Sequence, residues 1–278
     1  TEALLANGST EQKEKWLPLL ASGEAIGTLA FAEGEGRPSP KSLKTTVTDG
    51  KLSGRKLPVP DGRAADFAVV VASSDQGDGA TLYLVDLQQD GVSRVAVRTL
   101  DFTRGHAVIE FANVDAEPLG GAGAGWAALN QLLDRAAVLF AWEQVGIAES
   151  ALYQARDYAM GRYAFGRAIA SYQAIKHKLA EMYVKNTLAR SNCYYGAWAL
   201  NTNSAELPLA AATARVGGIQ AALYAAEENI QTHGGMGFTW EFDCQFYYRR
   251  AKLLSVNIGS EGFWQDRLIT AIEQNNAA

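Results

Sequence analysis

The sequence predicts an α+β chain with three successive parts: a helical N-terminal segment, an antiparallel β domain and a C-terminal four-helix bundle. Short runs rich in Val, Thr and aromatic residues are concentrated between residues 25 and 119. From residue 126 onward, apolar residues recur with a helical period. A glycine-rich stretch separates the two patterns. We therefore expect domains at residues 1–24, 25–119 and 120–278.

The N-terminal segment is expected to be helical over residues 1–20. Ser9 is followed three residues later by Gln12, which is the spacing of a capping box. Pro18 is expected to limit how far this helix runs, because proline lacks a backbone donor. The chain begins with Thr1 rather than Met and shows no signal peptide. We therefore expect a fragment or a processed subunit that lacks an upstream piece.

The middle segment is expected to form a small antiparallel β domain. Asp49-Gly50 lies between two β-prone runs, and this dipeptide favours a two-residue hairpin turn because both residues accept positive φ. Four further strands are expected at residues 67–71, 81–85, 92–98 and 107–111.

The C-terminal part is expected to be a bundle of long antiparallel helices joined by mostly short loops. The expected helices span residues 126–162, 170–200, 209–232 and 243–256, with a short helix after Trp264. The glycines at residues 120–125 lack the Gly-Lys-Ser/Thr ending of a phosphate-binding loop, so we expect a flexible joint there.

Composition excludes several classes of function. The chain of 278 residues is 48% hydrophobic and 20% charged, which is typical of a folded globular protein. Its net charge of −5 argues against a nucleic-acid partner. No apolar run approaches the roughly 18 residues of a membrane span. Cys193 and Cys244 do not form a C-x-x-C pair, which excludes a disulfide scaffold and a zinc module. We expect two buried thiols in a reducing cytoplasm rather than a catalytic thiol.

Several motifs, in order along nearly the whole chain, resemble those of the acyl-CoA dehydrogenase family. Residues 162–166 and 172–177 resemble its R-x-x-F-G and Q-A-I segments. Residues 231–238 resemble its Q-x-x-G-G-x-G-F turn, and residues 249–252 resemble its R-D-A-K element. Residues 12–24 resemble a stretch that contains L-P-x-L-x-x-G-E. The resemblance implies the family fold, with only a remnant of its N-terminal helical domain present here.

The resemblance also implies a reaction. Members of the family use FAD and a carboxylate base to desaturate an acyl-CoA thioester between Cα and Cβ. The base takes the α proton while the flavin accepts a hydride from Cβ. An electron-transfer flavoprotein is then the implied electron acceptor.

This sequence departs from the family where a subunit contacts its own flavin. The family's T-E-P-G-S-G-S-D loop corresponds to residues 32–39, in which Ala32 replaces the threonine and Glu35 adds a negative charge. In the next element, W-I-T-N-G, Pro58 replaces the tryptophan and Pro60 replaces the threonine. These changes remove a stacking surface and hydrogen-bond donors.

The catalytic base is also missing from its usual positions. The two family positions fall on Ile258 and near Ala136, and neither side chain ionises. Glu261 and Glu143 are weak candidates, since a lone glutamate is more often a structural partner. By the same resemblance, Asp134 and Arg135 are weak candidates for contacting CoA, although an intrahelical surface pair is as good an interpretation.

The bundle retains the family residues that contact a neighbour's flavin. Those residues are Arg162, Phe165, Gln173, Gln231, Gly234 and Gly235. Arginine suits a pyrophosphate because its planar fork pairs with phosphate oxygens. The chain thus resembles the subunit that lacks the base in an α₂β₂ enzyme, as in actinobacterial sterol side-chain degradation. In that interpretation FAD lies at the interface with a homologous subunit.

Two alternatives remain open from the sequence. One is a self-sufficient homotetrameric dehydrogenase with an unusual base such as Glu261, and the other is a non-catalytic structural partner that binds no flavin. The aromatic residues Tyr194, Tyr195 and Trp198 are expected in core or interface packing rather than in a substrate site.

Overall fold

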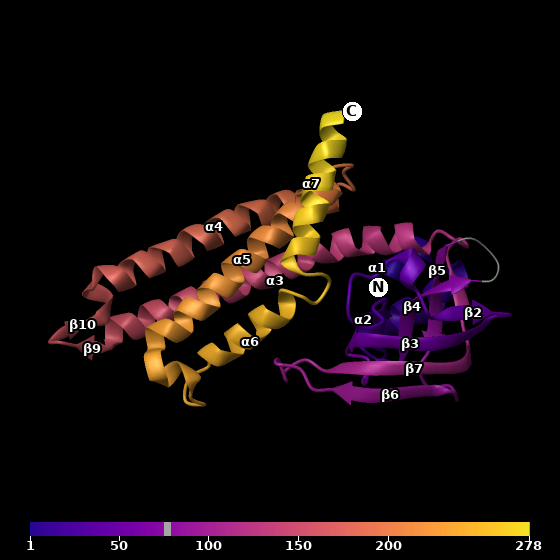
Figure 1. Ribbon diagram of the computed structural model, residues 1–278, viewed down its shortest axis with the longest axis horizontal. Coiled ribbons are helices and arrows are strands. Elements are labelled where there is room, and N and C mark those ends of the chain that lie inside the picture. Colours follow the sequence, from indigo (N-terminus) through magenta and orange to yellow (C-terminus); the bar gives the residue numbers. More distant parts are fainter. Residues whose placement is uncertain (75–78, 278) are drawn as a thin grey trace. The chain divides into compact units, whose positions relative to one another are not determined.

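The computed structural model describes residues 1–74 and 79–277. The chain divides into two compact units, Thr1–Leu132 and Leu133–Ala278. The first unit contains a β-sheet with short helices, and the second is helical (Figure 1). This confirms the predicted α+β fold class, while the predicted domain boundaries stay predictions.

Two helices open the first unit, α1 (Glu2–Asn7) and α2 (Thr10–Ser22). The predicted capping box is present: the Gln12 amide donates to Ser9 Oγ at 3.2 Å, and the Ser9 amide donates to Gln12 Oε1 at 3.0 Å. The expectation that Pro18 limits the helix is wrong, because α2 continues to Ser22. Proline removes only one donor, and the ring of Trp16 packs 4.3 Å from that of Phe67, which holds the helix on the sheet.

An eight-stranded sheet forms the body of this unit, in the order β6-β7-β3-β2-β4-β5-β8 with β1 paired to β4. Its strands are β1 (Gly27–Ala30), β2 (Thr46–Thr48), β3 (Lys51–Pro60), β4 (Phe67–Ser74), β5 (Ala80–Asp86), β6 (Val92–Val97), β7 (His106–Asp115) and β8 (Glu117–Leu119). The predicted Asp49-Gly50 turn joins β2 to β3, with φ of 48° and 75°. A wholly antiparallel domain was the wrong expectation, because β1 and β2 both run parallel to β4. The β2–β3 hairpin lies between β1 and β4 in the chain, so β1 returns to β4 through a crossover.

The glycine-rich run before the bundle is closely packed, so the expected flexible joint is wrong at Gly125. Helix α3 begins at this residue. A Cβ on Gly125 would lie 2.5 Å from backbone atoms of Thr81 in β5. The Gly123 amide also donates to Thr81 Oγ1 at 2.9 Å. Glycine is therefore required for a close approach of helix and strand.

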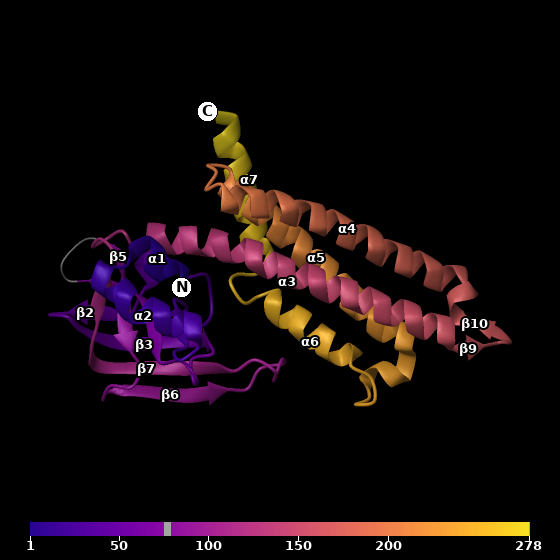
Figure 2. The same ribbon diagram turned by 180° about the vertical axis from the view of Figure 1, so that it is seen from behind.

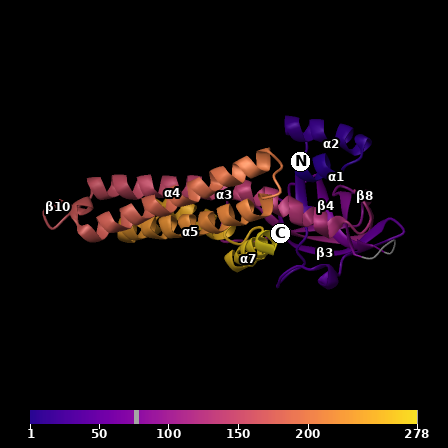
Figure 3. The same cartoon turned by 90° about the horizontal axis from the view of Figure 1, so that it is seen from above.

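The second unit is a bundle of long helices (Figures 2 and 3). Its first helix is α3 (Gly125–Gly161), whose residues 125–132 belong to the first unit. The elements that follow in chain order are β9 (Tyr163–Ala164), β10 (Arg167–Ala168), η2 (Ile169–Ser171), α4 (Gln173–Asn201), α5 (Leu207–His233), η3 (Gly234–Phe238), α6 (Cys244–Leu254) and α7 (Glu261–Ala277). Helix α5 packs against α4, α6 and α7. The last helix is longer than expected and begins before Trp264.

Small residues let the bundle helices approach closely. A Cβ on Gly196 of α4 would lie 3.2 Å from the Val138 side chain of α3, and one on Gly218 of α5 would lie 3.2 Å from Ala141. The core between α3, α4 and α5 is correspondingly rich in alanine. Interhelical contact of this kind fixes where the helix ends lie, and those ends carry the candidate site.

Candidate functional site

The residues predicted to contact a cofactor gather at one end of the bundle. Helix α3 ends next to the β9–β10 hairpin, α4 starts there, and α5 returns to it (Figures 1 and 2). The rings of Tyr158 from α3 and His233 from α5 stack with centroids 4.1 Å apart. We call this region, residues 158–173 and 228–243, the hairpin end of the bundle.

Three polar side chains at the hairpin end have no partner within the described chain. Arg162 follows the last residue of α3, Gln173 is the first residue of α4, and Gln231 lies near the end of α5. All three are exposed, and none of their side chains forms a hydrogen bond or ion pair with a described residue. A guanidinium and two amides thus remain available to a ligand.

Phe165 occupies the tip of the hairpin in an unfavourable conformation. Its φ is 51°, in the left-handed region that a bulky residue rarely adopts, and its side chain is 97% exposed. Gly166 follows with φ of 80°. The Tyr172 hydroxyl braces the hairpin by donating to the Ala164 carbonyl at 2.9 Å. The fold therefore accepts strain and apolar exposure together, as is typical of a residue that contacts another molecule.

The Gly-Gly turn after α5 presents open backbone. Gly234 has φ of 60°, and a Cβ on either Gly234 or Gly235 would meet no heavy atom within 4 Å. The preceding His233 is buried, and its Nδ1 lies 2.9 Å from the Asn229 carbonyl oxygen. This histidine packs in the turn, and the glycine backbone is left accessible to a ligand.

Four further apolar side chains at the hairpin end were not predicted as site residues, although Tyr163 and Phe238 lie within the motifs quoted above. They are exposed by more than half of their surface and are Met160, Tyr163, Phe238 and Trp240. The sequence signal that could have indicated them is the pair of aromatic residues, Phe238 and Trp240, in the loop after the Gly-Gly turn. Together with Phe165 they give the polar groups an apolar surrounding.

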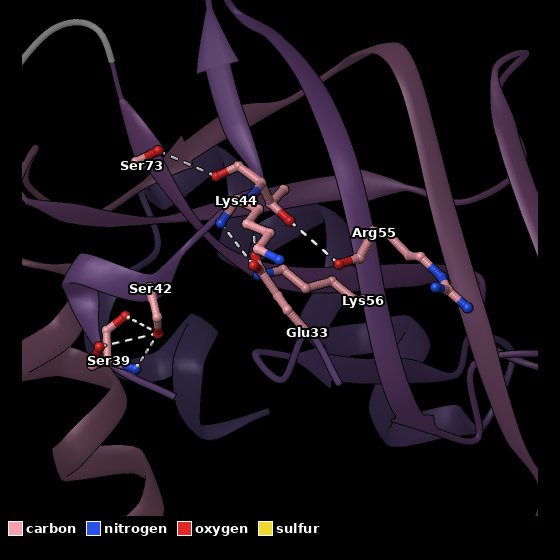
Figure 4. Close-up of polar contacts among 8 residues, drawn as sticks. Glu33, Ser39, Ser42, Lys44, Arg55, Lys56 and Ser73 are labelled. Carbon is pink, nitrogen blue, oxygen red and sulfur yellow. Dashed lines mark hydrogen bonds and ion pairs between the residues drawn. The ribbon is translucent and has the colours of Figure 1, made fainter. Parts of the chain in front are cut away.

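A buried ion pair holds the loop at residues 32–39, which corresponds to the loop with which family members contact the flavin of their own subunit (Figure 4). The Glu33 carboxylate accepts hydrogen bonds from Lys56 Nζ at 2.7 Å, from the Lys44 amide at 2.7 Å and from the Thr45 amide at 3.0 Å. Burial alone would raise the pKa of Glu33, but these hydrogen bonds outweigh it and lower the pKa. Lys56 is fully buried, and burial lowers its pKa.

A shallow groove of about 230 Å³ follows the same loop. It is lined by Phe31, Glu33, Gly34, Glu35, Gly36, Arg37, Pro38, Ser42, Leu43 and Lys44. Ala32 has no hydroxyl, and its carbonyl accepts from the Leu57 amide at 2.8 Å. Pro58 lies in a register irregularity of β3, and neither it nor Pro60 has an N–H to donate. The Glu33 carboxylate is already engaged by three donors of its own chain, and the two prolines offer no N–H to an anionic ligand.

Both glutamates that were candidates for a base are engaged in contacts within the bundle. Glu261 is the first residue of α7, and its Oε1 accepts from Gln220 at 2.7 Å and from Gln265 at 3.0 Å. Glu143 of α3 forms an ion pair with Arg250 of α6 at 2.8 Å. Each therefore bridges helices. Ile258, at the family's usual base position, is buried.

The candidates for CoA contact are likewise engaged within the bundle. Asp134 pairs with Arg267 of α7 at 2.5 Å. Burial raises the pKa of Asp134, although the charge of Arg267 opposes the rise. Arg135 donates to Asn203 Oδ1 at 3.1 Å. Asp134 and Arg135 thus contact different parts of the bundle, and a role in substrate binding stays a prediction.

A buried arginine in α5 was not foreseen. Arg215 is fully buried, and it donates to Gln144 Oε1 of α3 at 2.7 Å and to the Leu254 carbonyl at the end of α6. Burial lowers its pKa to about 9. In the sequence, the local feature that indicates a buried charge is the position of Arg215 in the middle of an alanine-rich helix. The residue joins three helices of the bundle.

Comparison with known proteins agrees with this arrangement. Residues 123–271 match the family model described as the C-terminal domain of acyl-CoA dehydrogenases. An acyl-CoA dehydrogenase of Bacillus subtilis is 31% identical over 276 residues, which cover 94% of this chain and 72% of that protein. The chain belongs to the acyl-CoA dehydrogenase family.

Two solved acyl-CoA dehydrogenase structures share the fold. Butyryl-CoA dehydrogenase from Megasphaera elsdenii superimposes with a TM-score of 0.91 at 25% identity, covering 97% of this chain and 74% of that chain. A variant of the steroid acyl-CoA dehydrogenase Tcur3481-Tcur3483 superimposes with a TM-score of 0.88 at 27% identity, covering 99% of this chain and 74% of that one. The chain thus spans about three quarters of these relatives.

Neither a membrane-spanning helix nor a metal-binding cluster of side chains is found among the described residues. None of the described helices is both long enough and apolar enough to cross a bilayer. Within residues 1–74 and 79–277, no group of three or more His, Cys, Asp or Glu side chains is arranged to bind a metal ion.

Proposed function

We propose that this chain is one subunit of an FAD-dependent acyl-CoA dehydrogenase that desaturates an acyl-CoA thioester between Cα and Cβ. Its hairpin end would contact a flavin bound mainly by a homologous partner subunit. The observation that carries this proposal is the set of groups on Arg162, Gln173 and Gln231 that no described residue engages, beside a fully exposed Phe165. These side chains are placed by three different helix ends, so their convergence is a property of the fold.

The donor set fits the anionic and aromatic parts of FAD. Arg162 would pair with phosphate oxygens through its planar fork. Phe165 would pack on an aromatic or apolar part of the cofactor, and the open backbone at Gly234 and Gly235 admits a ligand closely. FAD, when bound, supplies the hydride acceptor of the reaction. The chain's own contribution is to bind and orient.

The partner would supply the rest of the flavin site and the catalytic glutamate. The loop around Glu33 fits a flavin poorly, because its carboxylate is fully engaged and Pro58 and Pro60 replace donors. Ile258 is not ionisable, and Glu143 and Glu261 bridge helices. We infer an α₂β₂ assembly in the cytoplasm, with an electron-transfer flavoprotein as the acceptor. One of the structures that superimpose on this chain is a steroid acyl-CoA dehydrogenase whose name, Tcur3481-Tcur3483, joins two designations. This similarity supports a fatty or steroid side-chain acyl-CoA as the substrate class.

The flavin content of the purified protein tests the proposal. The chain alone should lack flavin absorbance, and the complex with its homologous partner should hold one flavin per pair. Arg162→Met should lower that content. Arg156→Met is the matched control, since Arg156 is exposed on α3, the helix that Arg162 directly follows, but is already paired with Asp157 at 2.7 Å. Flavin in the lone chain would favour the homotetramer, and none in the complex would favour a structural partner.

A second measurement separates the source of the base. Glu261→Gln should leave turnover of the complex nearly unchanged if the partner carries the catalytic glutamate. A loss of several orders of magnitude would instead support a self-sufficient enzyme that uses Glu261.

A further inference from the structure

The β9–β10 hairpin, which carries Phe165, has few contacts of its own to hold its shape. It projects from the end of the bundle beyond α3 and α4 (Figures 1 and 2). Its ladder consists of two residue pairs, Arg167 with Ala164 and Ala168 with Tyr163. A hairpin this short is unstable in water unless other contacts support it. Its turn adds a cost, because Phe165 has a φ of 51° and is neither glycine nor asparagine.

One side chain connects the hairpin to α4. Tyr172 directly precedes this helix, and its amide donates to the Ile169 carbonyl at 3.1 Å. Its hydroxyl reaches back to the hairpin and donates to the carbonyl of Ala164, next to the turn, at 2.9 Å. The Ile169 amide closes the base of the hairpin by donating to the Arg162 carbonyl at 2.8 Å. The backbone on both sides of Phe165 is therefore fixed relative to a helix of 29 residues.

The ring of Tyr172 holds a second cation beside the turn. The guanidinium carbon of Arg167 lies 4.0 Å from the centroid of this ring. That guanidinium forms no ion pair or hydrogen bond with a described residue, so the described chain does not neutralise its charge. Arg162, which precedes Phe165 in the chain, is likewise without an ion pair to a described residue. Two cations thus flank one exposed aromatic ring along the chain, a composition that suits an anionic ligand with aromatic parts.

We propose that Tyr172 is the positioning residue of the hairpin end. Its hydroxyl holds the turn so that the Phe165 ring is already presented before a ligand arrives, and its ring keeps the Arg167 guanidinium beside that turn. A preformed contact loses less conformational entropy on binding, which raises affinity without a new contact. Tyr172 acts through Phe165 and Arg167 rather than by touching the cofactor. The inference rests on the proposed function, because it concerns the same flavin contact.

Two variants of Tyr172 separate the role of the hydroxyl from that of the ring. In the complex with the homologous partner, FAD is removed and titrated back, and binding is followed by the change in flavin fluorescence. Tyr172→Phe should weaken the affinity for FAD about fivefold, which is the contribution of one ordinary hydrogen bond. Tyr172→Leu should weaken it roughly two- to fivefold more, because Arg167 also loses its cation–π contact. Equal affinities of the two variants would refute the role of the ring.

Tyr153 provides a matched control on α3, outside the hairpin end. Its hydroxyl donates to Glu149 Oε1 at 3.2 Å, and the guanidinium carbon of Arg156 lies 4.8 Å from the centroid of its ring. It therefore makes the same two kinds of contact as Tyr172. Tyr153→Phe and Tyr153→Leu should leave the affinity for FAD unchanged. A loss equal to that of the Tyr172 variants would show a general effect on the bundle and would overturn the proposal.

A double-variant cycle distinguishes positioning from a merely structural role. The hydroxyl of Tyr172 should matter only while the ring of Phe165 is present. Tyr172→Phe should therefore have little effect on FAD affinity in a Phe165→Ala background. Turnover at saturating FAD should equal that of the parent complex, because the variant changes how readily the site forms. An undiminished loss of affinity without the Phe165 ring, or a lowered turnover at saturating FAD, would overturn the positioning role.

The same measurements separate this proposal from the flavin site itself. Arg162→Met reports on whether the hairpin end contacts flavin, and Tyr172→Phe reports on positioning. A loss of flavin with Arg162→Met, together with an unchanged affinity in Tyr172→Phe, would refute the positioning role alone. No change in either variant would refute both the positioning role and the proposed flavin contact.

Discussion

Replacing Glu33 by glutamine tests whether a buried ion pair holds the loop that the family uses for its own flavin. Lys56 is fully buried, and its Nζ lies 2.7 Å from a Glu33 side chain that is 13% exposed. Removing one partner of such a pair costs about 3 to 5 kcal/mol, because the remaining charge is left uncompensated. The amide introduced by Glu33→Gln can still accept a hydrogen bond, so we expect a loss of about 3 kcal/mol, at the lower end of that range. Thermal unfolding of this unit should shift down by roughly 10 °C.

The matched control is an ion pair of similar length at the surface of the same unit. Lys51 and Asp115 lie 2.6 Å apart but are 41% and 78% exposed. Asp115→Asn should cost less than about 1 kcal/mol, because solvent screens an exposed pair. The double variant Glu33→Gln, Lys56→Met should recover most of the loss, since a buried pair is often replaced by apolar packing at little cost.

Acid titration provides a second signature of the same pair. The folded-state pKa of Glu33 lies below its ordinary value of 4.5. Between the two values the unfolded state binds more protons, so the stability contributed by Glu33 is present above pH 4.5 and is lost as the pH falls through the lower value. Glu33→Gln should lack this step. If Glu33→Gln is as stable as the parent at neutral pH, or the double variant is no more stable than the single one, the account of this loop is wrong.

Three further predictions concern single sites. Gly125→Ala should destabilise the protein by about 1 to 3 kcal/mol in denaturant unfolding, because its Cβ would overlap Thr81. Gly121→Ala should cost little, because the nearest atom to its Cβ would lie at 3.9 Å. An equal loss of stability in the two variants would contradict the close packing at Gly125. Phe165→Asn should stabilise the isolated chain by about 1 kcal/mol, because asparagine tolerates a positive φ, and a destabilised variant would show that the hairpin is not strained. Burial raises the pKa of Cys193 to about 12, so this thiol should not react with a thiol reagent until the chain unfolds, and rapid labelling of the native protein would show otherwise.

Local features of the fold were predictable from the sequence because neighbouring residues determine them. The Ser9–Gln12 capping box and the Asp49-Gly50 turn each depend on a few consecutive residues, and the long helices repeat one pattern over many turns. The parallel pairing of β2 with β4 depends on chain segments that are remote in sequence. The continuation of α2 past Pro18 likewise depends on the packing of Trp16 against the sheet.

The candidate site was predictable in composition but not in its contacts. Motif resemblance singled out Arg162 and Phe165, yet only the fold shows that their helix end lies beside the turn after α5. The same resemblance proposed Asp134 for CoA, and the structure pairs it with Arg267, 133 residues away. Ion pairs over such separations leave no periodic or compositional signal in a single sequence.

The contrast between two parts of this chain is the physical basis of the proposed division of labour. Glu33 is surrounded by donors from its own chain, so a ligand would have to compete with three hydrogen bonds already made. Arg162 and Gln173 are solvated and make no such bonds with the described residues, so a ligand need only displace water. Binding at the hairpin end therefore costs the chain less than binding at the loop. A second subunit that presents a flavin would consequently find its complementary surface at the hairpin end.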